Sequence, residues 1–390
     1  MKPSRCLLFL LLLGLLLPVH GRFFISSDPS GISHAYSRNT FGTVDIWNKT
    51  PFTAYSNPAV LAFHNGFSWA KSKDTWETLD SDSKVSFNAS MLSYAQNGLA
   101  IYIPAPNSKG QFGITMDLGD KEITDSSGQT AGSYKAKDKA QAYGMAINPL
   151  ELYRMFKAYD NQILNSIDLA LGTQLNLIEV NYPFEAGTKD IKGNSVNIGA
   201  IGSVNHTFGK ILKLEGVCGY SHLNVGKSEL KYPDNNAVPL DRWQSVGFAF
   251  SGTLKAEKFT KNLPFKHIIW FDDALALRYF SAQMKALDSQ NPDYDSYGYE
   301  IWLFDTFFLR GSHTYYEDTN EFIHPSGLGL NYGVGIKLHY KNILAFYYNN
   351  WTSPFRGFSW VWGSEPPEKP YKSDDMGINI DFMELIKLFR

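Results

Sequence analysis

The residues that could carry chemistry in this chain are few, and they form no catalytic motif. The segment Gly66-Phe67-Ser68-Trp69-Ala70 lacks the final glycine that a nucleophile elbow requires. The adjacent acids Asp272 and Asp273 have the spacing of a general acid and base or of a metal site, but paired carboxylates near a strand start are usually solvated. No His-Glu-x-x-His, Cys-x-x-Cys or phosphate-loop pattern occurs. We therefore predict no catalytic residue and no enzyme. A lipase-type barrel would need a Ser-His pair on one strand face, which the sequence does not supply.

Metal, cofactor and nucleic-acid sites are not indicated either. The nine histidines show no ligand spacing, so we predict no metal centre and no cofactor. A formal net charge of −2 and a pI near 6.5 give no reason to expect nucleic acid as a partner. One alternative stays open, because acidic residues in exposed loops could bind a divalent cation; these are Asp293, Asp295, Glu317, Asp318 and Glu321.

Residues 1–21 have the composition of a secretory signal peptide. A short basic start is followed by an apolar run from Cys6 to Leu17 and by a small residue, Gly21. The run is too short for a comfortable transmembrane helix. The chain after this cut holds one cysteine, Cys218, and so has no internal disulfide. An exported chain of this length without disulfides suits a large β protein.

Alternation of apolar and polar residues dominates the chain from about Gly66 onward. In Asn165–Leu177, Leu171 lies on the apolar face, while Asp168, Gln174 and Asn176 lie on the other. Period two over this length predicts a strand. Similar patterns predict fourteen strands, namely Gly66–Trp76, Lys84–Tyr94, Gly98–Ile103, Gln111–Gly119, Ala140–Asn148, Asn165–Leu177, Ser195–Thr207, Lys210–His222, Trp243–Leu254, Ile268–Gln283, Tyr297–Leu309, Leu328–Tyr340, Asn342–Trp351 and Met376–Leu388.

Other segments of the chain are assigned to connections. We expect the polar segment Asp120–Lys139 and the proline-containing segment Ser353–Asp375 to be long loops. Leu150–Tyr159 reads as a short helix within a connection. The end of the last strand is ambiguous, because Phe382, Leu385, Ile386 and Phe389 also fit a helix.

The composition favours a membrane barrel over a soluble fold. Aromatic residues make up 15% of the chain, yet mean hydropathy is −0.24 and no segment after the signal peptide approaches 18 consecutive apolar residues. The non-apolar face of the strands is mostly small and uncharged, which suits a crowded lumen, and aromatics gather near strand ends as interfacial girdles do. We predict an all-β fold, a transmembrane antiparallel β-barrel of about 14 strands, within a range of 12–16. The alternative is a soluble secreted β-sandwich that binds a ligand.

Short motifs near the start resemble a known family. Phe41-Gly42 followed by Tyr55-Ser56-Asn57-Pro58-Ala59-Val60-Leu61-Ala62 resembles the plug signature of FadL-like outer-membrane barrels, which include the PorV-like and PorQ-like proteins of type IX secretion. The segments Tyr299–Arg310, Gly327–Gly335 and Gly377–Asp381 are similar to the family's late strands. Three departures stand out: Phe41 replaces a glycine, Lys49-Thr50 replace an acidic pair, and Val60 replaces the motif glycine.

The resemblance implies an organisation and a function. We expect a signal peptide at 1–21, a plug at 22–63 inside the lumen and a barrel at 64–390. The plug motif would comprise Gly42, Asn57, Pro58, Ala59 and Leu61, with Asp168, Gln174 and Asn176 facing the lumen. The expected location is the outer membrane of a diderm bacterium, and the barrel assembly machinery would insert the chain. Partners would be outer-membrane lipid together with a hydrophobic small molecule that the barrel passes or with secretion-system proteins that it scaffolds.

Overall fold

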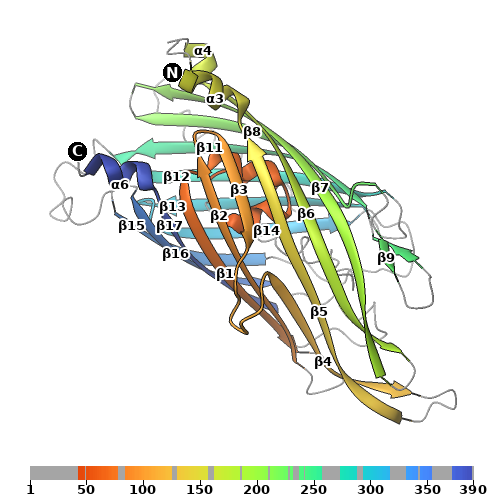
Figure 1. The fold of residues 1–390 in the computed structure, drawn as a ribbon. Coiled ribbons are helices and arrows are strands. Elements are labelled where there is room, and N and C mark those ends of the chain that lie inside the picture. Colours follow the sequence, from red (N-terminus) through yellow and green to blue (C-terminus); the bar gives the residue numbers. More distant parts are fainter. Residues whose placement is uncertain are drawn as a thin grey trace.

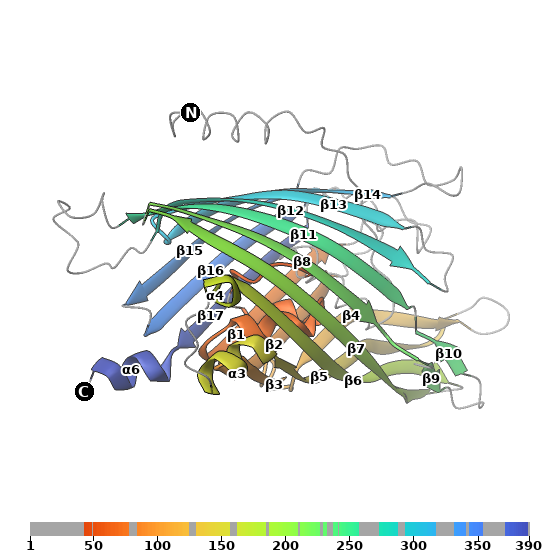
Figure 2. The same cartoon turned by 90° about the horizontal axis from the view of Figure 1, so that it is seen from above.

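The computed structural model describes residues 43–388 except for a set of connecting segments, which are 49, 78–83, 125–129, 157–161, 185–186, 210, 227–228, 232–236, 241, 257–272, 288–292, 317–330, 341–342 and 354–370. Its strands form one antiparallel sheet that closes on itself (Figures 1 and 2). They are β1 (Gly66–Glu77), β2 (Lys84–Gln96), β3 (Leu99–Pro104), β4 (Ile114–Thr124), β5 (Thr130–Ile147), β6 (Ile167–Phe184), β7 (Gly187–Phe208), β8 (Leu212–Leu223), β9 (Glu229–Lys231), β10 (Ala237–Pro239), β11 (Trp243–Lys255), β12 (Asp273–Ala286), β13 (Tyr294–Leu303), β14 (Phe307–Tyr316), β15 (Asn331–Tyr340), β16 (Leu344–Ser353) and β17 (Tyr371–Ile380).

Closure is made by the first and last strands. β1 pairs with β17 from Phe67↔Ile380 to Thr75↔Lys372. A single closed sheet leaves no lateral edge, which satisfies the backbone hydrogen bonds of every strand from within the wall. The alternative of two packed sheets, a soluble β-sandwich, is therefore wrong.

The seventeen strands occupy fourteen places in the wall. β3 and β4 lie end to end between β2 and β5, because each pairs with a different part of both neighbours. β9 follows β8 along the same edge of β7, and β10 pairs with β9 just as β11 pairs with β8. Counting each end-to-end pair once turns seventeen into fourteen, which confirms the predicted barrel of about 14 strands.

Side chains alternate between the two faces of the wall. Along β6, Leu171 is 48% exposed on the outer face, whereas Ala170 and Gln174 are buried on the inner face. β3 shows the same strict alternation of exposed and buried residues. The outward residues of the wall are mainly large and apolar, as expected for a surface that meets lipid.

Two predicted loops overlap strands, for a physical reason. Asp120–Lys139 is not a loop, because β4 continues to Thr124 and β5 begins at Thr130. Beyond the apolar belt both faces of a strand meet water, so alternation disappears while the hydrogen-bonded ladder continues. Likewise β17 begins at Tyr371, inside the predicted loop Ser353–Asp375.

Tyr297–Leu309 is not one strand but a hairpin of β13 and β14. The chain turns at Phe304 and Asp305, which have φ of 55° and 48°. Positive φ at both central residues is the type I′ requirement, which Asn-Gly usually meets. Asp305 is a common turn residue, but Phe304 is not, and no glycine, asparagine or proline accompanies them to mark a turn between two strands.

Three short helices lie at the end of the barrel where β1 begins and β17 ends (Figure 1). α3 (Pro149–Phe156) and α4 (Gln162–Asn165) connect β5 to β6, and α3 confirms the expected helix in that connection. α6 (Phe382–Leu388) follows β17. Asp381 accepts hydrogen bonds from the N–H groups of Met383 (3.0 Å) and Glu384 (3.1 Å), which starts this helix and ends the predicted strand Met376–Leu388 at Ile380.

Candidate functional site in the plugged lumen

Residues 43–48 and 50–63 lie inside the barrel as a plug (Figure 2). They form two 3-10 helices, η1 (Pro51–Tyr55) and η2 (Pro58–Phe63). Each starts in the same way, with a capping side chain and then proline: Thr50 accepts from the N–H of Phe52, and Asn57 accepts from the N–H of Ala59. Both helices are almost wholly buried, and their apolar side chains share one core with the inner faces of the wall.

Asn57 fixes the plug to the wall through its side-chain amide. Its Nδ2 donates to the carbonyl oxygens of Thr43 (2.9 Å), Tyr220 (3.2 Å) and Ala200 (3.3 Å). The last two carbonyls belong to β8 and β7, so one side chain joins the plug to two wall strands. Asn57 is fully buried, and losing such a side chain would leave buried polar atoms unpaired.

Three wall glycines make room for this contact. A Cβ added at Gly199 would lie 1.9 Å from Oδ1 of Asn57, and one at Gly172 would lie 2.4 Å from the backbone nitrogen of Ala59. At Gly219 it would lie 2.2 Å from the carbonyl oxygen of Thr43. These positions need glycine because the plug backbone approaches the wall too closely for any side chain.

A buried charge network holds the other side of the plug. Arg310 on β14 donates from Nε to Glu300 on β13 (2.8 Å), and Arg278 on β12 donates to the same carboxylate (2.7 Å). Asp45 of the plug lies 3.7 Å from Arg310. Asp45, Glu300 and Arg310 are all buried, and two carboxylates balance two guanidinium groups. The plug thus places a carboxyl group beside the buried ion pairs of the wall.

Burial shifts the protonation of the plug carboxyl, which lies outside the membrane-spanning strands. The pKa of Asp45 is raised from 3.8 to about 7, first by burial and then by the neighbouring Glu300 carboxylate. Arg310 and Arg278 act in the opposite direction.

Aromatic side chains surround this network. The Arg278 guanidinium lies 5.2 Å from the ring centres of both Trp47 and Trp302, within the range of cation–π attraction. Trp47 also donates its indole N–H to Glu215 on β8 (3.0 Å). Trp302 stacks on Phe308 with ring centres 4.5 Å apart. The plug tryptophan, Trp47, is thus held by a cation–π contact and by a hydrogen bond.

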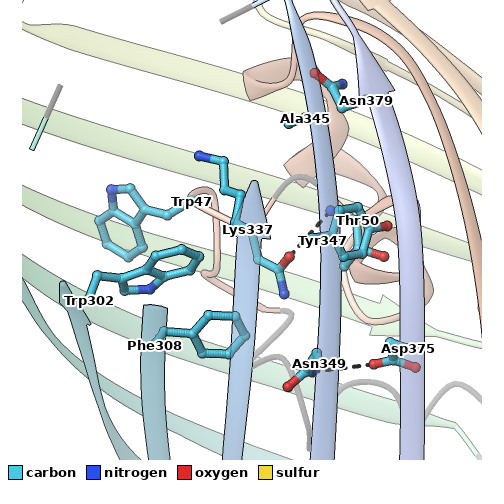
Figure 3. Close-up of a pocket in the computed structure, with 11 residues that line it drawn as sticks. Trp47, Thr50, Trp302, Phe308, Lys337, Ala345, Tyr347, Asn349, Asp375 and Asn379 are labelled. Carbon is cyan, nitrogen blue, oxygen red and sulfur yellow. Dashed lines mark hydrogen bonds between the residues drawn. The ribbon is translucent and has the colours of Figure 1, made fainter. Parts of the chain in front are cut away.

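A cavity opens beside these rings, between the plug and strands β13–β17. The cavity volume is about 30 Å³, and it reaches about 520 Å³ only when the open solvent at its mouth is counted. In Figure 3, Trp47, Trp302 and Phe308 lie on one side, with Tyr347, Asn349 and Asp375 on the other. The remaining lining residues are Asn48, Thr50, Lys337, Ala345 and Asn379. Four aromatic rings beside a few polar groups form the kind of lining that holds an apolar ligand in a fixed orientation.

The residues singled out in the sequence lie in different parts of this arrangement. Asn57, Pro58, Ala59 and Leu61 are buried in η2 or cap it, whereas Gly42 lies outside the described residues. The three expected lumen residues all lie on the inward-facing side of β6, away from the cavity; they are Asp168, Gln174 and Asn176. Gln174 accepts from the hydroxyl of Tyr102 (2.5 Å), and Asn176 donates to Ser195 (3.0 Å). Asp168 pairs with Arg154 of α3 and with Asn148.

The residues that β13 and β14 contribute to the charge network and to the cavity were missed in the sequence. Glu300, Trp302, Phe308 and Arg310 come from two strands that the sequence pattern merged into one. Glu300 lies within a strand that was predicted from the alternation of its apolar residues. A carboxylate at such an inward position is a signal, because a buried carboxylate requires a basic partner.

No metal or membrane-helix feature is found in the described part of the chain. Among these residues no group of three His, Cys, Asp or Glu side chains could hold a metal ion. Of the acids considered for loop cation binding, Glu317, Asp318 and Glu321 lie outside the described residues, as does Asp272. No helix within the described ranges is both long and apolar enough to cross a membrane.

Comparison with known proteins gives structural neighbours only. No family model and no curated protein sequence matches the chain. The toluene transporter TbuX of Ralstonia pickettii is similar over 84% of this chain and 92% of its own, with 9% identity and a TM-score of 0.42. The Pseudomonas putida toluene transporter TodX is similar over 84% of this chain and 93% of its own, with 9% identity and a TM-score of 0.40. A FadL homologue from Pseudomonas aeruginosa covers 93% of this chain and all of its own at 11% identity, with a TM-score of 0.34. The fold itself is established by the chain's own strand pairing.

Proposed function

We propose that this chain is an outer-membrane channel that passes a hydrophobic small molecule through a plugged lumen. The observation that carries the proposal is the aromatic cavity at the edge of the plug, formed by Trp47, Trp302, Phe308 and Tyr347. A closed wall with an apolar outer face fits a membrane barrel, and the plug inside it fits a gated rather than an open pore.

The two sides of the plug suggest where passage occurs. On the β5–β8 side, η2 and Asn57 contact the wall at glycines, and little space remains. On the β13–β17 side, residues 45–48 and 50 are held through side chains and adjoin the cavity. A ligand therefore meets the less tightly fixed half of the plug.

Deletion of Phe24–Phe63 tests whether the segment closes the barrel. The truncated chain should insert and conduct ions in a planar bilayer, while the full-length chain stays nearly silent. Equal conductance of the two proteins would contradict the proposal.

Substitution in the cavity tests the passenger. Trp302→Ala removes a lining ring, and it should slow uptake of a labelled apolar aromatic compound by cells that express the protein. Phe250→Ala removes an aromatic from the outer face, where Phe250 is 58% exposed, and it should leave uptake unchanged. Equal uptake by Trp302→Ala and wild type would assign the cavity no role in transport.

A scaffold role is the second candidate, and the length of three strands favours it. β5, β6 and β7 have 18, 18 and 22 residues, whereas each of β13–β17 has 10. The extra residues of β5, β6 and β7 extend past the ends of the shorter strands on one side of the barrel (Figure 1). This part contains a small apolar cluster formed by Ile178, Ile191, Leu230 and Leu240. Such a rigid extension could hold a partner at the cell surface, for example a secretion-system protein. A variant in which the extensions of β5, β6 and β7 are shortened tests this role. The role is supported if the variant keeps uptake of the apolar compound but no longer crosslinks to a partner protein.

A further inference from the structure

The outer face of β1 changes character halfway along the strand. Phe67 and Trp69 point outward near the start of β1, and Lys71 and Lys73 follow on the same face. The residues between them, Ser68, Ala70 and Ser72, are buried on the inner face. Within the described chain, neither Lys71 nor Lys73 has an ion-pair partner. Two lysines without an ion-pair partner, next to the apolar outer residues Phe67 and Trp69, require a physical reason.

The neighbouring strands also carry polar residues outward. Ala89 and Met91 of β2 pack against the plug core. Because side chains alternate along a strand, Asn88 and Ser90 point outward. Yet both are buried, at 2% and 0% exposure, because the excursion 105–113 between β3 and β4 lies over them.

The excursion stands on the outside of an unbroken wall (Figure 1). Ser90 accepts from the backbone N–H of Ala105 (3.0 Å) and donates its own N–H to Gly113 (3.1 Å), so the ladder continues past the inserted residues. Ser108 donates to Asn88 (2.8 Å), and Asn107 donates to Thr115 (3.0 Å). The result is a fixed polar surface where lipid tails would otherwise touch the wall.

Register brings three lysines around this surface. Lys73 is paired with Asn88 and Lys71 with Ser90 across the β1–β2 ladder, so their side chains are neighbours on one face. Lys109 of the excursion reaches Ser86 (3.4 Å) on the same strand and pairs with Asp117 (2.9 Å). Three ammonium groups therefore surround the neutral hydrogen-bonding side chains of Asn88 and Ser86.

The height of the cluster places it near one leaflet. A tilted strand rises roughly 2.6 Å per residue, so Lys73 lies roughly 18 Å above Gly66, in an apolar band about 25 Å tall. The long lysine stem lets each ammonium reach further up, toward the headgroups. Tight turns such as Asn97-Gly98 lie at the Gly66 end, which is the inner side in barrels of this kind. The cluster thus faces the outer leaflet.

We propose that Lys71, Lys73 and Lys109 bind the phosphate-bearing headgroup of an anionic lipid in the outer leaflet, on the polar surface made by Asn88 and the excursion 105–113. Lysine is a common phosphate ligand, and the three ammonium groups outnumber the two nearby carboxylates, Asp117 and the Asp374 that lies opposite Lys73 in the β1–β17 register. The site rests on the membrane location proposed above but not on transport, since none of its residues lines the cavity.

Native mass spectrometry of the full chain in mild detergent tests the site. The probes are bisphosphorylated lipid A and the same lipid with its phosphates removed. We expect one phosphorylated lipid per chain in the wild type. The double variant Lys71→Gln/Lys73→Gln should bind it about tenfold more weakly, and Lys109→Gln should also weaken binding. Lys285→Gln, an exposed outer-face lysine on β12, is the matched control and should bind as the wild type does.

Folding and function are checked on the same samples. A heat-dependent gel shift shows that each variant is a folded barrel, and uptake of the apolar compound should be unchanged in the double variant. Equal binding of both lipids, or equal binding by the double variant and wild type, would overturn the site while leaving the channel proposal intact. Co-purification of a protein that the double variant loses, with lipid binding unchanged, would also overturn it.

Discussion

Gly199 and Gly172 carry the closest approach between plug and wall. An alanine at Gly199 would place its Cβ 1.9 Å from the Asn57 side chain, and one at Gly172 would meet plug backbone at 2.4 Å. Either substitution should push the plug out of place, at a cost of about 1–3 kcal/mol in overpacking. We expect higher bilayer conductance and faster proteolysis of the plug. Gly216→Ala is the control, because its nearest neighbour would be 3.6 Å away. If all three variants show the low conductance of the wild type, the position of the plug does not depend on these contacts.

Leu171 and Asn176 test the two faces of one strand. Leu171 is 48% exposed on the outer face of β6, whereas Asn176 points inward and bonds to Ser195. Leu171→Arg places a charge in lipid, which costs about 2–4 kcal/mol near the midplane. Asn176→Arg keeps the charge inside the barrel and should cost clearly less. Urea unfolding in lipid vesicles measures both, and equal losses would mean that Leu171 does not meet lipid.

The plug as an element should respond to pH through Asp45. Its pKa rises to about 7 in the docked plug, above the ordinary 3.8, so docking favours the protonated form. This contribution is complete below pH 3.8 and is lost as pH rises through about 7. We therefore expect channel openings to increase as pH rises from about 4 to about 7 and to change little above about pH 8. Asp45→Asn should remove the dependence, since an amide does not titrate. An unchanged pH profile in that variant would assign the effect to another group.

The strand elements show what sequence patterns can and cannot reveal. Alternation located most of the wall, because one face meets lipid and the other meets the plug. The count of fourteen nevertheless combined two errors that cancelled. β3 and β4 were counted as two places in the wall but share one, and the hairpin of β13 and β14 was counted as one strand but fills two. The alternation of apolar and polar residues reveals which face of a strand a side chain occupies. It does not reveal which strands pair, because pairing partners lie far apart along the chain.

The candidate site was harder to predict than the wall. Asn57-Pro58 was recognisable, because a capping side chain followed by proline is a local signal. The charge network was not, since Asp45 meets residues of β12, β13 and β14 only after the barrel closes. No spacing in the sequence encodes that meeting.

At the scale of the whole molecule, the closed wall predicts how the protein behaves in extraction. The chain should sediment with outer membranes and require detergent to leave them. Unheated and boiled samples should migrate differently on gels, because a closed sheet resists unfolding by detergent alone. Recovery of folded protein from the periplasm without detergent would contradict the membrane location.

The pairing of β1 with β17 also dictates an order of assembly. Phe67 and Ile380 are partners at opposite ends of the chain, so this seam has the longest loop to close and must form late. The plug precedes β1 directly and reaches the inner faces of β5–β7. A seam that sealed first would leave only the barrel mouths as routes for a folded insert of two helices. The plug is therefore best placed as the template on which the early strands collect, with the seam as the final, slow step.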